Sequence, residues 1–179
     1  MRSFLWAVPW FAPGIALAIV VGFVARRRVA AWLGASDAVA WAVVVAFGLV
    51  LSATLTPLRE GAGDLSAGTC DLTRIGFASL HDLRSLNDTS LNVLLFVPLG
   101  IVLAILPRSP RKALLVIVAC AMPLAIEMTQ LVAIPLDRAC ESADVVDNMT
   151  GLVIGLTIGA VAGMISGQAD SSTGRAGSR

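Results

Sequence analysis

The sequence predicts an all-α polytopic membrane protein with about five transmembrane helices. Hydrophobic residues make up 57% of its 179 residues and charged residues only 14%, a balance too apolar for a soluble globular domain. The apolar residues also gather in long runs, each close to the roughly 20 residues that a helix needs to cross about 30 Å of hydrocarbon. The formal net charge of +1 gives no basis for a nucleic-acid partner.

Each run is predicted to form one helix, and the ranges are about 4–24, 38–56, 90–106, 113–134 and 146–165. The third is the shortest and lies near the lower length limit for a span. The first is preceded by one arginine, Arg2, but its cluster of three arginines follows it, opposite to the order in a signal peptide. No small-residue cleavage site follows it either, so we expect a retained helix. Asp88 is predicted to cap the third helix, since its carboxylate can accept from free backbone N–H groups.

The basic residues orient these helices. If all the ranges span, one side of the membrane carries Arg26 to Arg28, Arg108 to Lys112, and Arg175 with Arg179. Basic residues in short loops favour the cytoplasmic side. The sequence therefore predicts a multi-pass protein of the cell membrane with its N-terminus outside and its C-terminus in the cytoplasm.

The chain is predicted to hold one membrane domain, residues 1–166. The remaining residues, 167–179, are rich in Ser, Gly and Ala and show no apolar periodicity. A segment of such low hydrophobicity cannot bury enough apolar surface to fold. We therefore expect a disordered cytoplasmic tail.

The connections 57–89 and 135–145 are predicted to lie outside, and both contain residues that bear on the structure there. Within 71–88, apolar residues recur at helical spacing among charged ones, a pattern typical of a helix lying on the outer membrane surface. Cys70 and Cys140 fall in these connections, where disulfides persist, whereas Cys120 lies inside an apolar range. We predict a Cys70–Cys140 bridge that ties the 57–89 loop to the 135–145 hairpin, and two free thiols are the alternative.

Polar residues within the last three apolar ranges mark the candidate site. Glu127 lies deep in an apolar helix with Gln130 on the same face. A charge at the bilayer centre costs about 2.5–3.5 kcal/mol on insertion scales, so such acids are usually functional. Further polar residues lie near the same predicted depth or in the adjoining hairpin, namely Asn92, Arg138, Asp144 and Asn148.

Each of these residues also has a purely structural interpretation. Asp144 can cap the fifth helix, and Asp147 then occupies a favourable position near the positive end of the helix dipole. Asn92 and Asn148 can serve as hydrogen-bonding contacts between helices. Arg138 can be an ordinary surface residue, yet it is the only cation that the sequence places to offset the acids on the outer side.

The fifth range carries a face of small residues at four-residue intervals: Gly151, Gly155, Gly159 and Gly163. Glycines at this spacing let another helix approach closely and gain van der Waals contact, where lipid offers no hydrophobic driving force. A homo-oligomer assembled through this glycine face is therefore one prediction.

Several enzyme and cofactor motifs are missing from the sequence. There is no glycine-rich phosphate loop, no paired-histidine metal helix, no Cys-x-x-Cys and no Gly-x-Ser-x-Gly. Oxygen ligands of the kind that Mg²⁺ and Ca²⁺ prefer are present in Glu127, Asp144 and Asp147, but they are scattered. We therefore predict no cofactor and no metal site, and the missing motifs favour a protein that is not an enzyme over an enzyme without excluding the latter.

The order and spacing of the polar residues resemble the VanZ-like family of small bacterial membrane proteins. The resemblance covers about 87–163 and rests on Asn92-Val-Leu-Leu-Phe96-Val-Pro98-Leu-Gly100, Glu127-x-x-Gln130, and Arg138 six residues before Asp144, with Asn148, Gly151 and Gly155 following. The first two apolar ranges match only in being hydrophobic. The sequence departs from the family at Cys140, where an aromatic residue is common, and at Ala143, where a second acid often precedes Asp144.

The resemblance implies a cell-envelope protein whose founding member is associated with teicoplanin resistance. Three functions are open. The first is binding of a membrane lipid or lipid-linked envelope molecule, such as a cell-wall lipid precursor or a lipoglycopeptide, in a polar pocket near the outer leaflet. The second is an intramembrane hydrolase or transferase with Glu127 or Asp144 as general base. The third is a structural partner that assembles through the glycine face.

Overall fold

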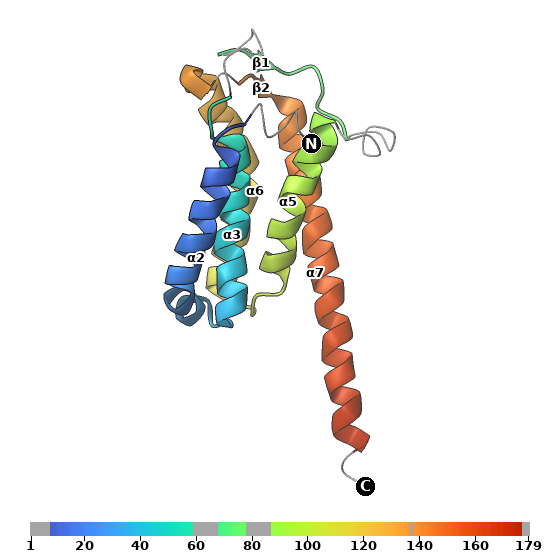
Figure 1. Ribbon diagram of the computed structural model, residues 1–179. Coiled ribbons are helices and arrows are strands. Elements are labelled where there is room, and N and C mark those ends of the chain that lie inside the picture. Colours follow the sequence, from blue (N-terminus) through green and yellow to red (C-terminus); the bar gives the residue numbers. More distant parts are fainter. Residues whose placement is uncertain (1–7, 59–67, 78–86, 137, 177–179) are drawn as a thin grey trace.

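The fold is an antiparallel helix bundle in a computed structural model that describes residues 8–58, 68–77, 87–136 and 138–176 (Figure 1). The helices of the described residues are α2 Phe11–Leu33, α3 Asp37–Thr54, α5 Asp88–Ala104, α6 Pro110–Val132 and α7 Ser142–Ala176. A 3-10 turn, Ile134–Leu136, and two short strands, β1 Cys70–Asp71 and β2 Cys140–Glu141, lie at one end. A disulfide between Cys70 of β1 and Cys140 of β2 lies here, so we call this end the disulfide end. The prediction of an all-α membrane protein is confirmed.

The lengths of the helices agree with most of the predicted spans. Helices α3, α6 and the Ser142–Ile165 part of α7 are long and apolar enough to cross a membrane, and α5 is an apolar helix of 17 residues. Helix α2 runs past the predicted range, through the arginines to Leu33, while residues 1–7 lie outside the described residues. It ends at Gly34, whose φ of 67° stops the helix in the left-handed region that glycine tolerates best.

Helices α5 and α7 lie side by side because glycines line their contact (Figure 1). A Cβ atom added at Gly151 would overlap the carbonyl oxygen of Val93, and one added at Gly155 would overlap that of Val97. At Gly159 it would lie 2.6 Å from Ala104 Cβ. The glycine face is thus occupied by a helix of the same chain as far as this residue. Association of two copies stays a prediction.

The last glycine of the series lies outside this contact. A Cβ atom at Gly163 would meet nothing within 4 Å.

The hydrophobic core fills the space among α3, α5, α6 and α7. Its fully buried side chains are Val50, Phe96, Leu99, Leu103, Ala119 and Leu152.

The predicted disordered tail is helical over most of its length. Helix α7 continues to Ala176, well beyond the ends of the other helices, and only 177–179 lie outside the described residues (Figure 1). The prediction of disorder rests on composition, which measures the ability of a segment to fold alone. A segment attached to an existing helix needs no new nucleus, and each added residue brings a backbone hydrogen bond.

The cap of α5 also differs from the prediction. Asn87, not Asp88, is the N-cap: its side-chain oxygen accepts from Ser90 N–H at 2.9 Å, and the Ser90 hydroxyl accepts from Asn87 N–H at 3.1 Å. This reciprocal pair satisfies two backbone donors at once. Asp88 lies in the first turn, where a carboxylate interacts favourably with the helix dipole.

The predicted surface helix at 71–88 is absent from 71–77, and 78–86 lie outside the described residues. The chain instead forms strand β1, which pairs in parallel with β2 in the register Cys70 to Cys140. The Asp71 carboxylate accepts from the Thr73 N–H at 2.8 Å, a local bond that competes with helix formation. Periodicity alone could not predict that long-range pairing would hold this segment extended.

Cys70 and Cys140 form a disulfide that joins segments 70 residues apart in sequence, with 4.4 Å between their Cα atoms. Cys120 is a free and exposed thiol.

The Cys70–Cys140 bridge constrains the unfolded chain, so Cys70→Ser should lower the free energy of unfolding by about 2–4 kcal/mol. Thermal unfolding in detergent with and without reductant checks this. Cys120→Ser is the matched control and should stay as sensitive to reductant as the wild type. A melting temperature independent of reductant would speak for two free thiols.

Candidate functional site

The polar residues predicted from the sequence all line one cavity of about 540 Å³ at the disulfide end. They come from three helices and the connection after α6: Asn92 from α5, Glu127 and Gln130 from α6, Arg138 from the connection, and Asp144 and Asn148 from α7. The antiparallel order explains this convergence, since α5 and α7 begin at the end where α6 finishes. We call this space the polar cavity.

Glu127 is buried, with only 2% of its surface exposed. One of its carboxylate oxygens, Oε2, accepts from the backbone N–H of Glu141 at 2.7 Å. That N–H belongs to β2, which is held in place by its pairing with β1 and by the disulfide. The acid therefore does not face lipid, and the main chain of the hairpin supplies a hydrogen bond to it.

Gln130 and Arg138 both bind the C-terminal end of α3. Gln130 Nε2 donates to the Thr54 carbonyl at 3.0 Å. Arg138 donates from Nη2 to the Ala53 carbonyl at 2.8 Å and from Nε to the Thr56 carbonyl at 3.3 Å. The last carbonyls of a helix have no partner within it, and a positive charge is favourable there. These two side chains thus fasten α3 to the cavity wall.

The electrostatics of Arg138 follow from this position. Burial lowers the pKa of its guanidinium, while the nearby carboxylates of Asp144 and Glu127 oppose that shift. Within the described part of the chain, neither carboxylate lies within ion-pairing distance of the guanidinium. Arginine still keeps its charge in proteins. Arg138 therefore supplies positive charge to the cavity without closing a salt bridge across it.

The side chains from α5 and α7 complete the cavity wall. The Asn92 amide of α5 and the Asp144 carboxyl of α7 lie near each other and both line the cavity. Asn148 is 1% exposed, and its Oδ1 has no hydrogen-bond partner. Most buried polar groups in folded proteins are paired, so the unpaired acceptor of this cavity-lining residue can take a donor from outside the chain.

The sequence analysis missed an ion pair next to this site. Asp147 is 1% exposed and pairs through Oδ2 with Arg74, whose backbone carbonyl accepts from the Ser142 hydroxyl at 2.8 Å. Arg138 is therefore not the only cation near the acids, and Asp147 is more than a residue at a helix terminus. The one available signal was the predicted disulfide, which brings Arg74, four residues after Cys70, near the start of α7.

A family model described as VanZ/LLP1 matches residues 39–163. The matched region begins in α3, so the likeness reaches further than the range 87–163 on which the sequence resemblance rested. Helix α3 belongs with the rest because its end is bound by Gln130 and Arg138. No curated protein and no solved structure matches the chain.

Proposed function

The chain belongs to the VanZ/LLP1 family, and on that premise we propose that its polar cavity binds an amphiphile of the cell envelope. The observation that carries this proposal is the convergence of six polar side chains from separate elements on one cavity of about 540 Å³. A cavity of this size matches the range of small-molecule sites. Polar side chains from several helices are not needed in one place for packing alone.

Besides Thr54, Asp88 and Glu141, the remaining wall of the cavity consists of apolar residues, which suit the hydrocarbon part of an amphiphile. It includes Phe11, Leu91, Leu94 and Leu95. Leu94 is 56% exposed and Leu91 is 37% exposed, so both also lie on the outside of the bundle. A ligand can therefore place its headgroup in the cavity while its tail follows α5 into the bilayer.

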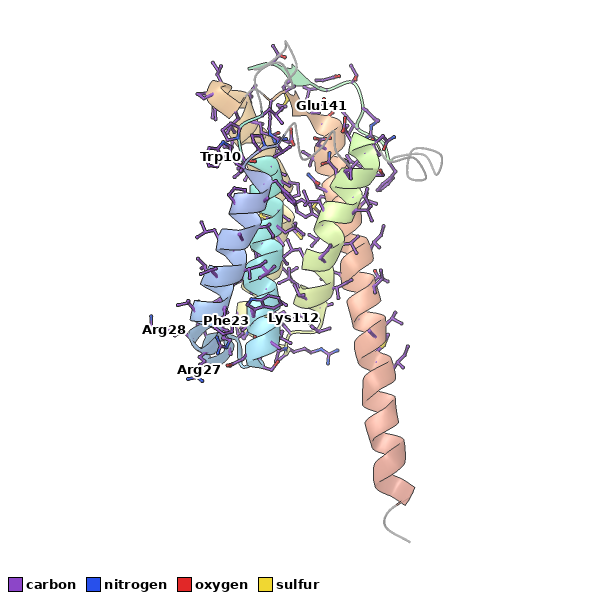
Figure 2. The ribbon with its side chains drawn as sticks, viewed as in Figure 1. Trp10, Phe23, Arg27, Arg28, Lys112 and Glu141 are labelled. Carbon is purple, nitrogen blue, oxygen red and sulfur yellow. A yellow bond between two sulfur atoms is a disulfide. The ribbon has the colours of Figure 1, made fainter. Side chains whose placement is uncertain are left out.

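The distribution of charge supports an outer-leaflet location. Figure 2 shows Trp10 and Glu141 toward the disulfide end, and Arg27, Arg28 and Lys112 toward the opposite end. The positive-inside rule assigns the basic end to the cytoplasm. The cavity then opens at the outer face, where cell-wall lipid precursors and lipoglycopeptides occur. Binding of either would account for a link to teicoplanin resistance.

A second candidate function is hydrolysis or transfer at a lipid headgroup. Glu127 and Asp144 both line the cavity, and either carboxylate can act as a general base. This candidate differs from simple binding in one readout, because only a catalyst changes the mass of the lipid. The same preparation can therefore test both candidates.

The test uses purified protein in lipid nanodiscs with two probes, a fluorescent lipid-linked cell-wall precursor and a fluorescent teicoplanin. Glu127→Gln keeps the side-chain shape and an acceptor for Glu141 N–H, yet it removes the charge. We expect it to weaken binding of the preferred probe by about tenfold or more, or about 1.4 kcal/mol. Asp37→Asn, at the opposite end of the bundle, is the matched control and should bind as the wild type does.

The outcomes separate the candidates. If Glu127→Gln and Asn148→Leu both bind the probes as tightly as the wild type does, the polar cavity is not the binding site. Mass spectrometry of the recovered probe decides between binding and catalysis, because a product that forms with wild type and not with Glu127→Gln would establish the enzymatic role.

A further inference from the structure

The charged groups that line the polar cavity are mostly carboxylates. Among the described lining residues the acids are Asp88, Glu127, Glu141 and Asp144, and the cation is Arg138. Asp147 adds no charge to this set, since it pairs with Arg74. When these acids are ionised, an anionic headgroup entering the cavity meets more charge of its own sign than of the opposite sign, and such juxtaposition is costly.

The position of Arg138 does not reverse this balance. Two of its N–H groups are directed to the carbonyls of Ala53 and Thr56 at the end of α3. These two donors therefore satisfy backbone carbonyls at the end of α3. Arg138 offsets part of the negative charge, but it is not presented as a free fork for a phosphate or carboxylate, which is the arrangement that bidentate anion recognition uses.

The unpaired oxygen of Asn148 adds an independent requirement. Oδ1 can only accept, and it belongs to a buried side chain of a residue that lines the cavity. A phosphate oxygen or a quaternary ammonium group offers it no donor. A protonated primary or secondary amine offers both an N–H donor and a positive charge.

We propose that the amphiphile bound in the polar cavity carries a protonated amine, which pairs with the carboxylates of Glu127 and Asp144 and donates to Asn148 Oδ1. This inference rests on the proposed amphiphile-binding function and specifies the headgroup. Among the described residues, no three Asp, Glu, His or Cys side chains are grouped as a metal ion requires. Dispersed acceptors suit an organic cation with several N–H groups better than a point charge.

The experiment compares three probes that share a dodecyl tail and differ in the headgroup: dodecylamine, dodecyltrimethylammonium and dodecyl phosphate. Radiolabelled probe is equilibrated with the full-length protein in nanodiscs of zwitterionic lipid, and partition into empty nanodiscs is subtracted. We expect dodecylamine to bind about tenfold more tightly than the other two. Dodecylamine and dodecyltrimethylammonium both carry one positive charge, but only dodecylamine can donate a hydrogen bond. The difference between their affinities therefore reports the hydrogen bond.

Variants assign that preference to residues. Asn148→Leu should bring dodecylamine down to the affinity of dodecyltrimethylammonium and leave the latter unchanged. Asp144→Asn and Glu127→Gln should each weaken the binding of both dodecylamine and dodecyltrimethylammonium. Asp37→Asn, an exposed acid at the opposite end, should change neither, and size-exclusion profiles of all variants report whether they fold.

Each outcome bears on a different claim. If dodecyl phosphate binds most tightly and Glu127→Gln alters that binding, the cavity holds an amphiphile but the amine is the wrong headgroup. Equal affinity for all headgroups would also overturn the amine. If no probe binds above empty nanodiscs, this inference fails, while the fluorescent-probe test still judges the proposed function on its own ligands.

Discussion

Gly155→Ala is expected to destabilise the bundle by about 3 kcal/mol or more, the upper end of the usual cost of overpacking. The added Cβ would overlap the carbonyl oxygen of Val97, and the next nearest atoms, Gly100 Cα and Ile101 N, are also backbone. Backbone cannot rotate out of the way as a side chain can, so α5 and α7 must move apart. The apparent melting temperature in detergent, followed by fluorescence-detected size exclusion, measures the loss.

Gly163→Ala is the matched control on the same face of the same helix. Its Cβ would enter open space, and alanine favours a helix over glycine by about 1 kcal/mol in peptides, so this variant should melt at or above the wild-type temperature. If both alanine variants melt alike, the close contact between α5 and α7 is not a feature of the folded protein. The two variants should differ in ligand binding as well, since separating α5 from α7 pulls Asn92 away from Asp144.

Arg74→Ala is expected to cost about 3 kcal/mol, the lower end of the range for removing one partner of a buried ion pair. Asp147 would be left 1% exposed without its partner, and its other oxygen, Oδ1, already has none. The lower end applies because the Arg74 side chain is 35% exposed and solvent screens part of the interaction. Thermal unfolding of the variant and the wild type in the same detergent measures the effect.

Two comparisons make this prediction specific. Adding Asp147→Ala to Arg74→Ala should restore much of the stability, because no uncompensated charge then stays buried. Asp37→Asn breaks the contacts of Asp37 with Arg26 at 3.6 Å and with Arg27 at 4.0 Å. These contacts are partly solvent-exposed, so the change should cost between about 0 and 1 kcal/mol. If Arg74→Ala costs no more than Asp37→Asn, the ion pair with Asp147 does not contribute to the folded state.

The membrane helices and the members of the polar cavity followed from local properties of the sequence. Apolar runs of fixed length predict helices, and helices that alternate in direction bring Asn92, Glu127 and Asn148 to one end. An acid in an apolar run needs no alignment to stand out, because its burial is costly wherever it occurs. The cysteines likewise fell on one side once the basic residues had oriented the helices.

The partners of these residues were decided by tertiary structure. Glu127 accepts from the backbone of Glu141, and every residue except proline carries such a donor, so no sequence pattern singles it out. Arg74 and Asp147 are 73 residues apart, and each had a plausible solvent-facing role. The spacing of the α7 glycines predicts that a helix packs closely against them, but only the tertiary structure shows that this helix is α5. Local pattern therefore determines which groups must be buried, whereas the identity of what satisfies them depends on contacts between distant segments.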